Sequence, residues 1–294
     1  MSIPSDINCM KINSISPQEH KYLQILNTIA KKPETLHFTG KLPDHRVTSV
    51  AIVGSRKPTS YGKEVTYRLS FELAKRGIVI ISGLALGVDG VAHRAALDAG
   101  GTTIAVVANG VDIIYPASHQ SLAKEIIEKG GAIISEYPPG TEARDFYFLA
   151  RNRIVSGLAD AIVVTEAAIR SGTLSTVAHA LDQGREVFVA PGNITSPLSA
   201  GCNSLLKQGA QPVTCSEDIL EIIAPDLLKP QQILPLGNSS AESNIISLIQ
   251  SGLRDGDEIM ASSGLSASEF SQTLTMLEIA GSIRALGGNQ WTLR

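Results

Sequence analysis

Between residues 47 and 189, short apolar runs alternate with longer stretches in which apolar side chains recur every three or four positions. The short runs are rich in β-branched residues, which is typical of strands buried on both faces. The longer stretches have the spacing of helices with one buried face. This alternation predicts a parallel, doubly wound α/β sheet. The predicted strands are Val47–Val53, Ile78–Ser82, Thr102–Val107, Ala132–Ser135, Ala161–Thr165 and Glu186–Val189.

The segments on either side of this pattern predict an extension and a linker. Residues 1–46 form an N-terminal extension, in which residues 19–30 have the spacing of one amphipathic helix that ends at Lys31-Lys32-Pro33. We therefore place the sheet domain at residues 47–223. Residues 224–241 are rich in Pro, Gln, Leu and Ser, which indicates a linker to a second domain.

The tail, residues 242–294, has the pattern of a winged-helix-like domain. Three helices are predicted at Glu242–Ser251, Asp255–Ser263 and Ser266–Ala280, followed by two short strands. Ser266 and Glu269 make a capping box at the start of the third helix. That helix contains no Lys or Arg, whereas a helix that reads a DNA groove needs basic side chains. We expect a protein contact or a regulatory role instead.

Composition narrows the class of protein without assigning a function. The net charge of −3 gives no global attraction to nucleic acid, so such a role requires a local basic cluster. The three cysteines contain no C-x-x-C pair, and no apolar run is long enough to cross a bilayer. We expect a cytoplasmic protein without a metal site or cofactor.

Three small-residue loops follow predicted strands and indicate a phosphate site. They are Gly54-Ser55-Arg56, Ser82-Gly83 and Ser171-Gly172-Thr173. Ligands of such sheets bind at the carboxyl ends of the strands, and a helix N-terminus there favours anions. The first loop also fits a tight turn with a solvated arginine. Neither a G-x-G-x-x-G fingerprint in a strand–turn–helix context nor a Walker A pattern is present.

The strongest chemical cluster combines arginines with aromatic residues. Arg144, Arg151 and Arg153 surround three consecutive aromatics at positions 146–148. Arginines that contact phosphates beside rings that stack on bases make a single-strand platform. The same residues also fit an arginine-capped surface helix with core aromatics. Taken alone, they favour a small phosphorylated ligand slightly over nucleic acid.

Asp89 and His93 lie one helical turn apart in a glycine-rich segment. They have the spacing of an acid–base pair. A structural role, with Asp89 near a helix N-terminus and His93 bonded locally, is the interpretation that we prefer.

The motifs, taken in order, resemble those of the DNA-processing protein A family, DprA or Smf. They include VAIVGSRKPTSYG, ISGLALGVDGVAH, FLARNRIVSGLADAIVVTEA, SGTLSTVAHAL and GREVFVAPGN. The resemblance covers residues 47–213 closely, and the tail resembles the small winged-helix-like domain of the family. It implies an extended Rossmann-like fold that binds single-stranded DNA, forms homodimers and loads the RecA recombinase onto incoming strands.

The resemblance also implies which residues contact DNA. The arginine of the GSR motif falls on Arg56, and the aromatic residue of F-x-x-R-N-R falls on Phe148. The remaining implied positions are Arg151, Asn152, Arg153 and Arg185, with Arg144 nearest to a basic position that family members have ahead of the aromatic residue.

The sheet pattern is also similar to that of cytokinin-activating phosphoribohydrolases. Their P-G-G-x-G-T-x-x-E loop supplies a catalytic glutamate, but in residues 170–176 of this chain Ser or Thr takes its place. Since such hydrolysis needs a carboxylate, its absence favours a binding protein. We therefore predict a non-enzymatic protein that protects incoming single-stranded DNA and loads RecA during transformation and recombination. The alternative is a nucleotide or nucleoside-phosphate hydrolase.

Overall fold

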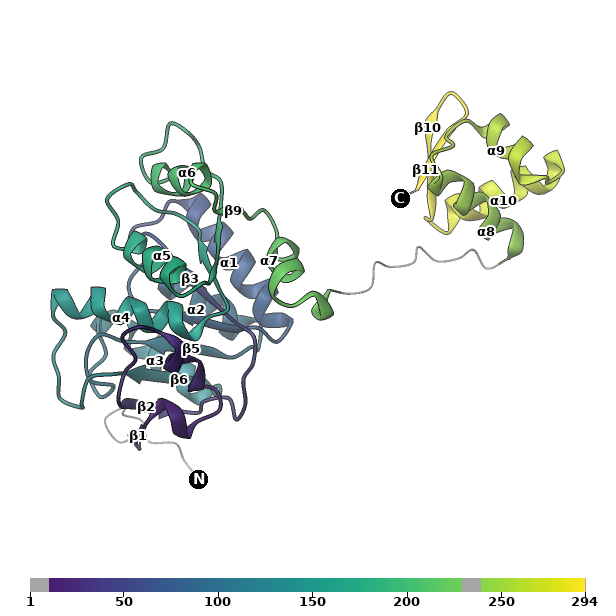
Figure 1. Cartoon of the computed structure of the whole chain (residues 1–294). Coiled ribbons are helices and arrows are strands. Elements are labelled where there is room, and N and C mark those ends of the chain that lie inside the picture. The colour runs from purple at the N-terminus through teal and green to yellow at the C-terminus, as the bar shows by residue number, and fades with distance from the viewer. Residues whose placement is uncertain (1–10, 229–238, 294) are drawn as a thin grey trace. The chain divides into compact units, whose positions relative to one another are not determined.

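The structure is a computed structural model that describes residues 11–228 and 239–293 (Figure 1). The chain divides after Leu228 into two compact units. The first unit is built on a nine-stranded sheet with the order β1-β2-β6-β5-β4-β3-β7-β8-β9. None of the described helices is both long and apolar enough to cross a membrane.

The parallel part of the sheet confirms the predicted α/β fold. Every pairing from β6 to β9 is parallel, and β3 lies between β4 and β7. The chain therefore winds away from β3 in both directions, which creates a topological switch point at its carboxyl end. The strands are β3 (Ser49–Val53), β4 (Val79–Ser82), β5 (Thr103–Val106), β6 (Ala132–Ser135), β7 (Ala161–Val164), β8 (Glu186–Val189) and β9 (Gln211–Pro212).

Helices cover both faces of this sheet, as Figure 1 shows. One apolar core packs α4, α5 and α6 against the sheet, and cores on the other face pack α1, α2, α3 and α7. The helices are α1 (Ser60–Lys75), α2 (Val88–Asp98), α3 (Gln120–Glu128), α4 (Asp145–Leu158), α5 (Thr173–Asp182), α6 (Ala200–Lys207) and α7 (Ser216–Ile223), with short 3-10 helices η4 (Ala117–His119) and η5 (Pro225–Leu227).

The N-terminal extension differs from the prediction. Residues 19–30 do not form one α-helix, because the segment holds only two 3-10 helices, η2 (Pro17–Glu19) and η3 (Gln24–Thr28). Leu23, Leu26 and Ile29 are buried, and their three-residue spacing fits a 3-10 turn, in which residues i and i+3 are eclipsed. Two strands that the sequence did not reveal, β1 (Asn13–Ile15) and β2 (Leu36–Gly40), extend the sheet: β2 pairs antiparallel with β6, and β1 pairs antiparallel with β2.

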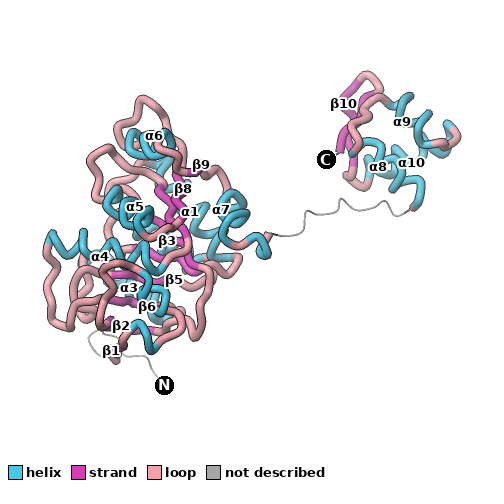
Figure 2. Tube along the Cα trace, in the orientation of Figure 1, coloured by secondary structure: helices cyan, strands magenta, loops and turns pink. Residues whose placement is uncertain are grey.

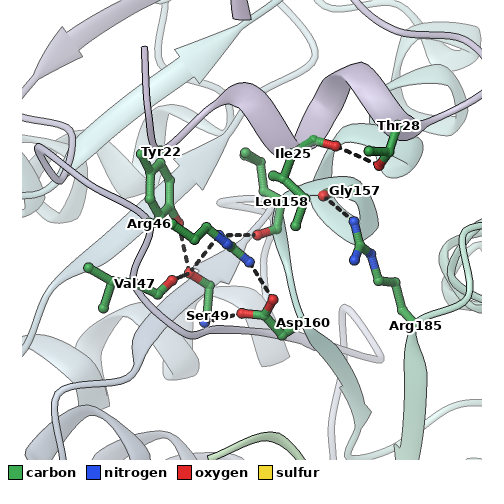
Figure 3. Close-up of polar contacts among 10 residues, drawn as sticks. All are labelled: Tyr22, Ile25, Thr28, Arg46, Val47, Ser49, Gly157, Leu158, Asp160 and Arg185. Atoms are coloured by element: carbon green, nitrogen blue, oxygen red, sulfur yellow. Dashed lines mark hydrogen bonds and ion pairs between the residues drawn. The ribbon is translucent and has the colours of Figure 1, made fainter. Parts of the chain in front are cut away.

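A polar cluster attaches this extension to the amino ends of β3 and β7 (Figure 3). The Tyr22 hydroxyl is hydrogen-bonded to Ser49 at 3.0 Å, and burial raises the pKa of Tyr22 to about 12. Arg46 forms an ion pair with Asp160 at 2.6 Å and donates to the Leu158 carbonyl at 3.0 Å. Its guanidinium also lies 5.5 Å from the centre of the Tyr22 ring. The extension is thus part of the first unit.

The second unit has the predicted winged-helix architecture, with its hairpin drawn in magenta in Figure 2. Its helices α8 (Ser240–Gln250), α9 (Gly256–Ser263) and α10 (Ala267–Ile279) enclose a separate apolar core with the hairpin β10 (Ile283–Gly287) and β11 (Gln290–Leu293). Ser266 and Glu269 form the predicted capping box. Residues 229–238 of the predicted linker lie outside the described residues.

Candidate functional site

A cavity of about 450 Å³ lies at the carboxyl ends of β4, β3 and β7, at the switch point of the sheet. It brings together residues from three strand-end loops and from α4. Of the residues that the sequence predicts for a binding site, those that line the cavity are Gly54, Arg56, Gly83, Phe148, Arg151, Asn152, Ser171, Gly172 and Thr173.

The loop between β3 and α1 is held close to its neighbours. A Cβ atom on Gly54 would lie 2.7 Å from the Val88 side chain and 2.9 Å from the Glu166 carbonyl oxygen, so this position requires glycine. The Ser55 backbone N–H donates to the same carbonyl at 2.7 Å. The Glu166 carboxylate also accepts from the Thr59 N–H at 2.7 Å and from its hydroxyl at 2.6 Å. One buried residue after β7 therefore fixes both ends of the loop that carries Arg56.

Arg56 and Phe148 form a cation–aromatic pair on this cavity. The Arg56 side chain is exposed, and its Cζ lies 5.3 Å from the centre of the Phe148 ring. The Phe148 ring also lies 5.7 Å from that of Tyr115. Among the described residues, Arg56 takes part in no ion pair. Its charge is therefore available to an anionic ligand, and the ring beside it offers a face for stacking.

Arg151 lies in the floor of the cavity and is only 5% exposed. Its guanidinium donates to the Gly83 carbonyl at 2.8 Å and to the Val106 carbonyl. A Cβ on Gly83 would lie 2.6 Å from the same guanidinium. Burial lowers the pKa of Arg151 to about 10, with the nearby Asp89 opposing that effect, so the side chain stays charged at neutral pH. Arg151 thus holds the β4–α2 loop and adds a buried positive charge.

Asp89 and His93 have the contacts of structural residues. The Asp89 carboxylate accepts from the Gly83 N–H at 3.1 Å and from the Ala85 N–H at 3.2 Å, and burial raises its pKa. The His93 ring is hydrogen-bonded to Thr103 at 2.7 Å, and burial lowers its pKa to about 3. These contacts support the structural interpretation over an acid–base pair.

The N-terminus of α5 forms another wall of the cavity. The Thr173 hydroxyl donates to the Gly54 carbonyl at 3.1 Å, which ties this wall to the β3–α1 loop. The Thr173 N–H donates to the Ser171 hydroxyl at 3.2 Å, while Gly172 is exposed with no heavy atom within 4 Å of the place of a Cβ. Arg170, which the sequence analysis did not select, also lines the cavity. The sequence feature that could have identified Arg170 is its position as a basic residue directly before the Ser171 loop.

Arg153 does not line the cavity, although it lies only two positions after Arg151. Two residues rotate a helix by about 200°, so the two side chains leave α4 on opposite sides. Arg153 forms an ion pair with Glu136 at 2.6 Å and donates to the Lys31 carbonyl at 2.9 Å. In the structure it therefore joins α4 to the N-terminal extension.

Four other predicted residues also lie outside the cavity lining. Ser55 accepts from the Lys57 N–H within its own loop, and the buried Ser82 hydroxyl donates to the Ile52 carbonyl at 2.7 Å. Arg144 is exposed and directly precedes α4. Arg185 directly precedes β8 and so lies at the amino ends of the strands, away from the cavity at their carboxyl ends. It donates to the Gly157 carbonyl at 3.1 Å (Figure 3).

Comparisons with known proteins identify a family whose models match both units of the chain. A family model described as DNA recombination-mediator protein A matches residues 13–224, and one described as the DprA winged helix domain matches residues 228–289. A putative DNA processing protein DprA from Mycobacterium tuberculosis is 41% identical over 252 residues, which cover 84% of this chain. The chain spans 64% of the length of that relative.

Two solved structures share the fold of the first unit. The X-ray structure of DNA processing protein A from Streptococcus pneumoniae has a TM-score of 0.68 and 39% identity, covering 72% of this chain and 75% of that one. The Helicobacter pylori protein, whose structure is described as showing a single-stranded DNA binding mode, has a TM-score of 0.65 and 32% identity. That match covers 74% of this chain and 98% of the other.

Proposed function

The chain belongs to the DNA recombination-mediator protein A family, and we propose that it binds single-stranded DNA in the cavity at the switch point of its sheet. The observation that carries this proposal is the exposed Arg56 guanidinium beside the Phe148 ring. Arg56 neutralises a phosphate, Phe148 stacks on a base, and the N-terminus of α5 adds backbone dipoles.

The wider role follows from the family. We propose that the protein acts in the cytoplasm as a homodimer, protects incoming strands and loads RecA onto them during transformation and recombination. Support comes from the family match over most of the chain and from the similarity to the H. pylori protein. The third helix of the second unit contains no Lys or Arg side chain. This favours a protein contact for that unit over binding in a DNA groove.

We further propose that the protein is not a hydrolase. Thr176 occupies the position of the glutamate in the P-G-G-x-G-T-x-x-E loop and lines the cavity. Among the lining residues only Asp89 has a carboxylate, and that carboxylate accepts from two backbone N–H groups of the β4–α2 loop. It is therefore poorly placed to act on a sugar centre. Release of free base from nucleoside monophosphates above a no-protein control would contradict this part of the proposal.

Binding of fluorescent oligonucleotides, measured by anisotropy over a range of salt concentrations, tests the proposal. Arg56→Ala removes a phosphate contact and flattens the slope of log K against log salt by about 0.7. Phe148→Ala weakens binding by about 1–3 kcal/mol and leaves the slope unchanged, because stacking releases no counterions. Arg68→Ala is the control, since Arg68 is an exposed arginine on α1 that does not line the cavity. A folded Arg56→Ala that binds like the wild type at every salt concentration would refute the proposed site.

A further inference from the structure

A second cavity, of about 500 Å³, lies beside the first at the carboxyl ends of β7 and β8. Its lining includes Thr59, Tyr61, Glu166, Pro191 and Ser199. We propose that it binds a nucleobase with an exocyclic amino group, on the same strand whose phosphate is held at Arg56. This inference rests on the proposed function and adds a base preference to it.

The two cavities are neighbours across one short loop, residues 54–59. Gly54 and Arg56 line the first cavity, and Thr59 lines the second. Glu166 stands between them, because its backbone carbonyl lies against Gly54 and accepts from the Ser55 N–H at 2.7 Å, while its side chain lines the second cavity. A strand that crosses the loop with a phosphate at Arg56 therefore brings an adjacent base to the second cavity.

The second cavity contains acceptors that the protein does not fully use. Glu166 is 2% exposed and, among the described residues, takes part in no ion pair. Each of its oxygens accepts one hydrogen bond from Thr59 and keeps a second lone pair. Because a buried carboxylate without a cationic partner is costly, further N–H donors from a ligand stabilise it.

Ser199 provides a second, independent feature of the same cavity. It is 4% exposed, lies at the N-cap of α6 and makes no side-chain capping bond. Within the described part of the chain its hydroxyl has no hydrogen-bond partner, although it lines the cavity. The Ser199 oxygen is not one of the fully buried atoms that lack a partner, so it can be reached from the cavity. The hydroxyl is thus free to pair with a polar edge of a ligand.

Tyr61 gives the cavity an aromatic wall. Tyr61 is 46% exposed, and its hydroxyl donates to the Pro191 carbonyl at 2.6 Å, which fixes the position of the ring. Tyrosine beside proline offers an apolar surface on which any base can stack. Selectivity then comes from Glu166, because a carboxylate accepts from the amino group of cytosine, adenine or guanine and repels the O4 carbonyl of thymine.

Oligodeoxycytidylate and oligodeoxythymidylate of equal length test this inference on the full chain. The two pyrimidines stack similarly. At C4 cytosine has an amino donor and thymine a carbonyl acceptor, while thymine also has an N–H at N3 and a 5-methyl group. We expect the wild type to bind the cytosine strand at least about 5-fold more tightly. Tyr61→Ala should weaken both strands by a similar factor, between about 5-fold and 150-fold, because stacking does not depend on the exocyclic group.

Glu166→Gln should reduce the preference to within about 2-fold, since an amide can also donate to thymine O4. The Gln side chain can still hydrogen-bond to both the N–H and the hydroxyl of Thr59. The melting temperature should therefore stay close to that of the wild type. Ser199→Ala removes a hydroxyl that has no partner in the protein, and should weaken the cytosine strand by about 2- to 10-fold. This second variant keeps the test valid if Glu166→Gln fails to fold.

Different results separate the inference from the proposed function. If both strands bind equally while Arg56→Ala still flattens the salt slope, the second cavity is not a base site but the first cavity stands. If neither strand binds, the proposed function itself is wrong. Excess deoxycytidine monophosphate should lower the cytosine preference more than excess thymidine monophosphate does, and an equal effect of the two nucleotides would overturn the inference.

Discussion

Replacing Arg151 with methionine tests whether the floor of the cavity depends on a buried charge. Met fills a similar volume but donates no hydrogen bond. The Gly83 and Val106 carbonyls then lose their donor, and Asp89 loses the positive charge that lowers its pKa. We expect Arg151→Met to fold with a distinctly lower stability.

The size of the effect follows from these contacts. An unsatisfied buried acceptor costs about 1–3 kcal/mol, and an uncompensated buried charge costs about 3–5 kcal/mol. Asp89 keeps its two backbone N–H donors, and the cost of burying Arg151 itself disappears. A net loss of about 3 kcal/mol is therefore reasonable. In a unit of this size each kcal/mol changes the melting temperature by about 2–4 °C, which gives a decrease of roughly 6–12 °C.

The pH dependence of this stability difference tests whether Asp89 is the group whose protonation is coupled to Arg151. Its pKa in the folded protein is raised above the ordinary value of 3.8, so its contribution to stability is full below that value and is lost as pH rises through the raised pKa. Without Arg151 the folded pKa rises further. The loss then continues to higher pH, and the difference from the wild type should grow as the pH rises through the raised pKa of Asp89.

Thermal unfolding followed by circular dichroism over a series of pH values measures this, with Arg153→Met as the comparison. Arg153 lies on the same helix and its side chain is 13% exposed, but it pairs with Glu136 rather than with the cavity floor. Its loss also leaves a carboxylate without its partner, so a pH dependence that the two variants share does not come from Asp89. The reasoning is wrong if Arg151→Met melts within about 2 °C of the wild type, or if its pH dependence is no larger than that of Arg153→Met.

Three further predictions concern other parts of the molecule. Gly83→Ala should lower both the melting temperature and the affinity for oligonucleotide, because the new Cβ would lie 2.6 Å from the Arg151 guanidinium; normal binding would contradict this. Arg46→Met should cost about 1–2 kcal/mol in urea unfolding, since the ion pair with Asp160 is part-exposed, and should leave oligonucleotide affinity unchanged. A chain ending at Leu228 should keep most of its affinity, and a truncated protein that binds as weakly as Arg56→Ala would make the second unit a primary DNA site.

The parallel strands β3 to β8 were predictable because they are short, mainly apolar runs buried in the sheet. The parallel strand β9 was not, since it consists of Gln211 and Pro212 and neither is buried. The antiparallel edge was not, because its pairings are distant in sequence: β2 pairs Phe38 with Ile134. No local pattern in residues 36–40 indicates that this segment pairs with β6. The short helices α6 and α7 were also missed, because the alternating pattern behind the prediction ends at residue 189. Asp218, an acidic residue three positions after the N-cap Cys215, was an available sequence signal for the start of α7.

The part of the candidate site that is formed by loops directly after strands was predictable from the sequence. Arg56, Phe148 and the Ser171 loop meet because parallel strands end at one edge of the sheet. Arg185 could have been separated from this group on the sequence alone, because it directly precedes a strand and therefore lies at the amino edge. The opposite directions of Arg151 and Arg153 follow only once both are placed on one helix, α4, which runs from Asp145 to Leu158.

The two loops that shape the cavity are fixed by buried groups of opposite charge. Arg151 holds the β4–α2 loop through the Gly83 carbonyl, and Glu166 holds the β3–α1 loop through the N–H and hydroxyl of Thr59. Each charge is satisfied largely by backbone or hydroxyl groups rather than by a direct ion pair with the other. The loops therefore keep one conformation while Arg56 stays exposed. A flexible strand loses entropy when it is ordered, so a site that is already ordered lowers the total cost of binding.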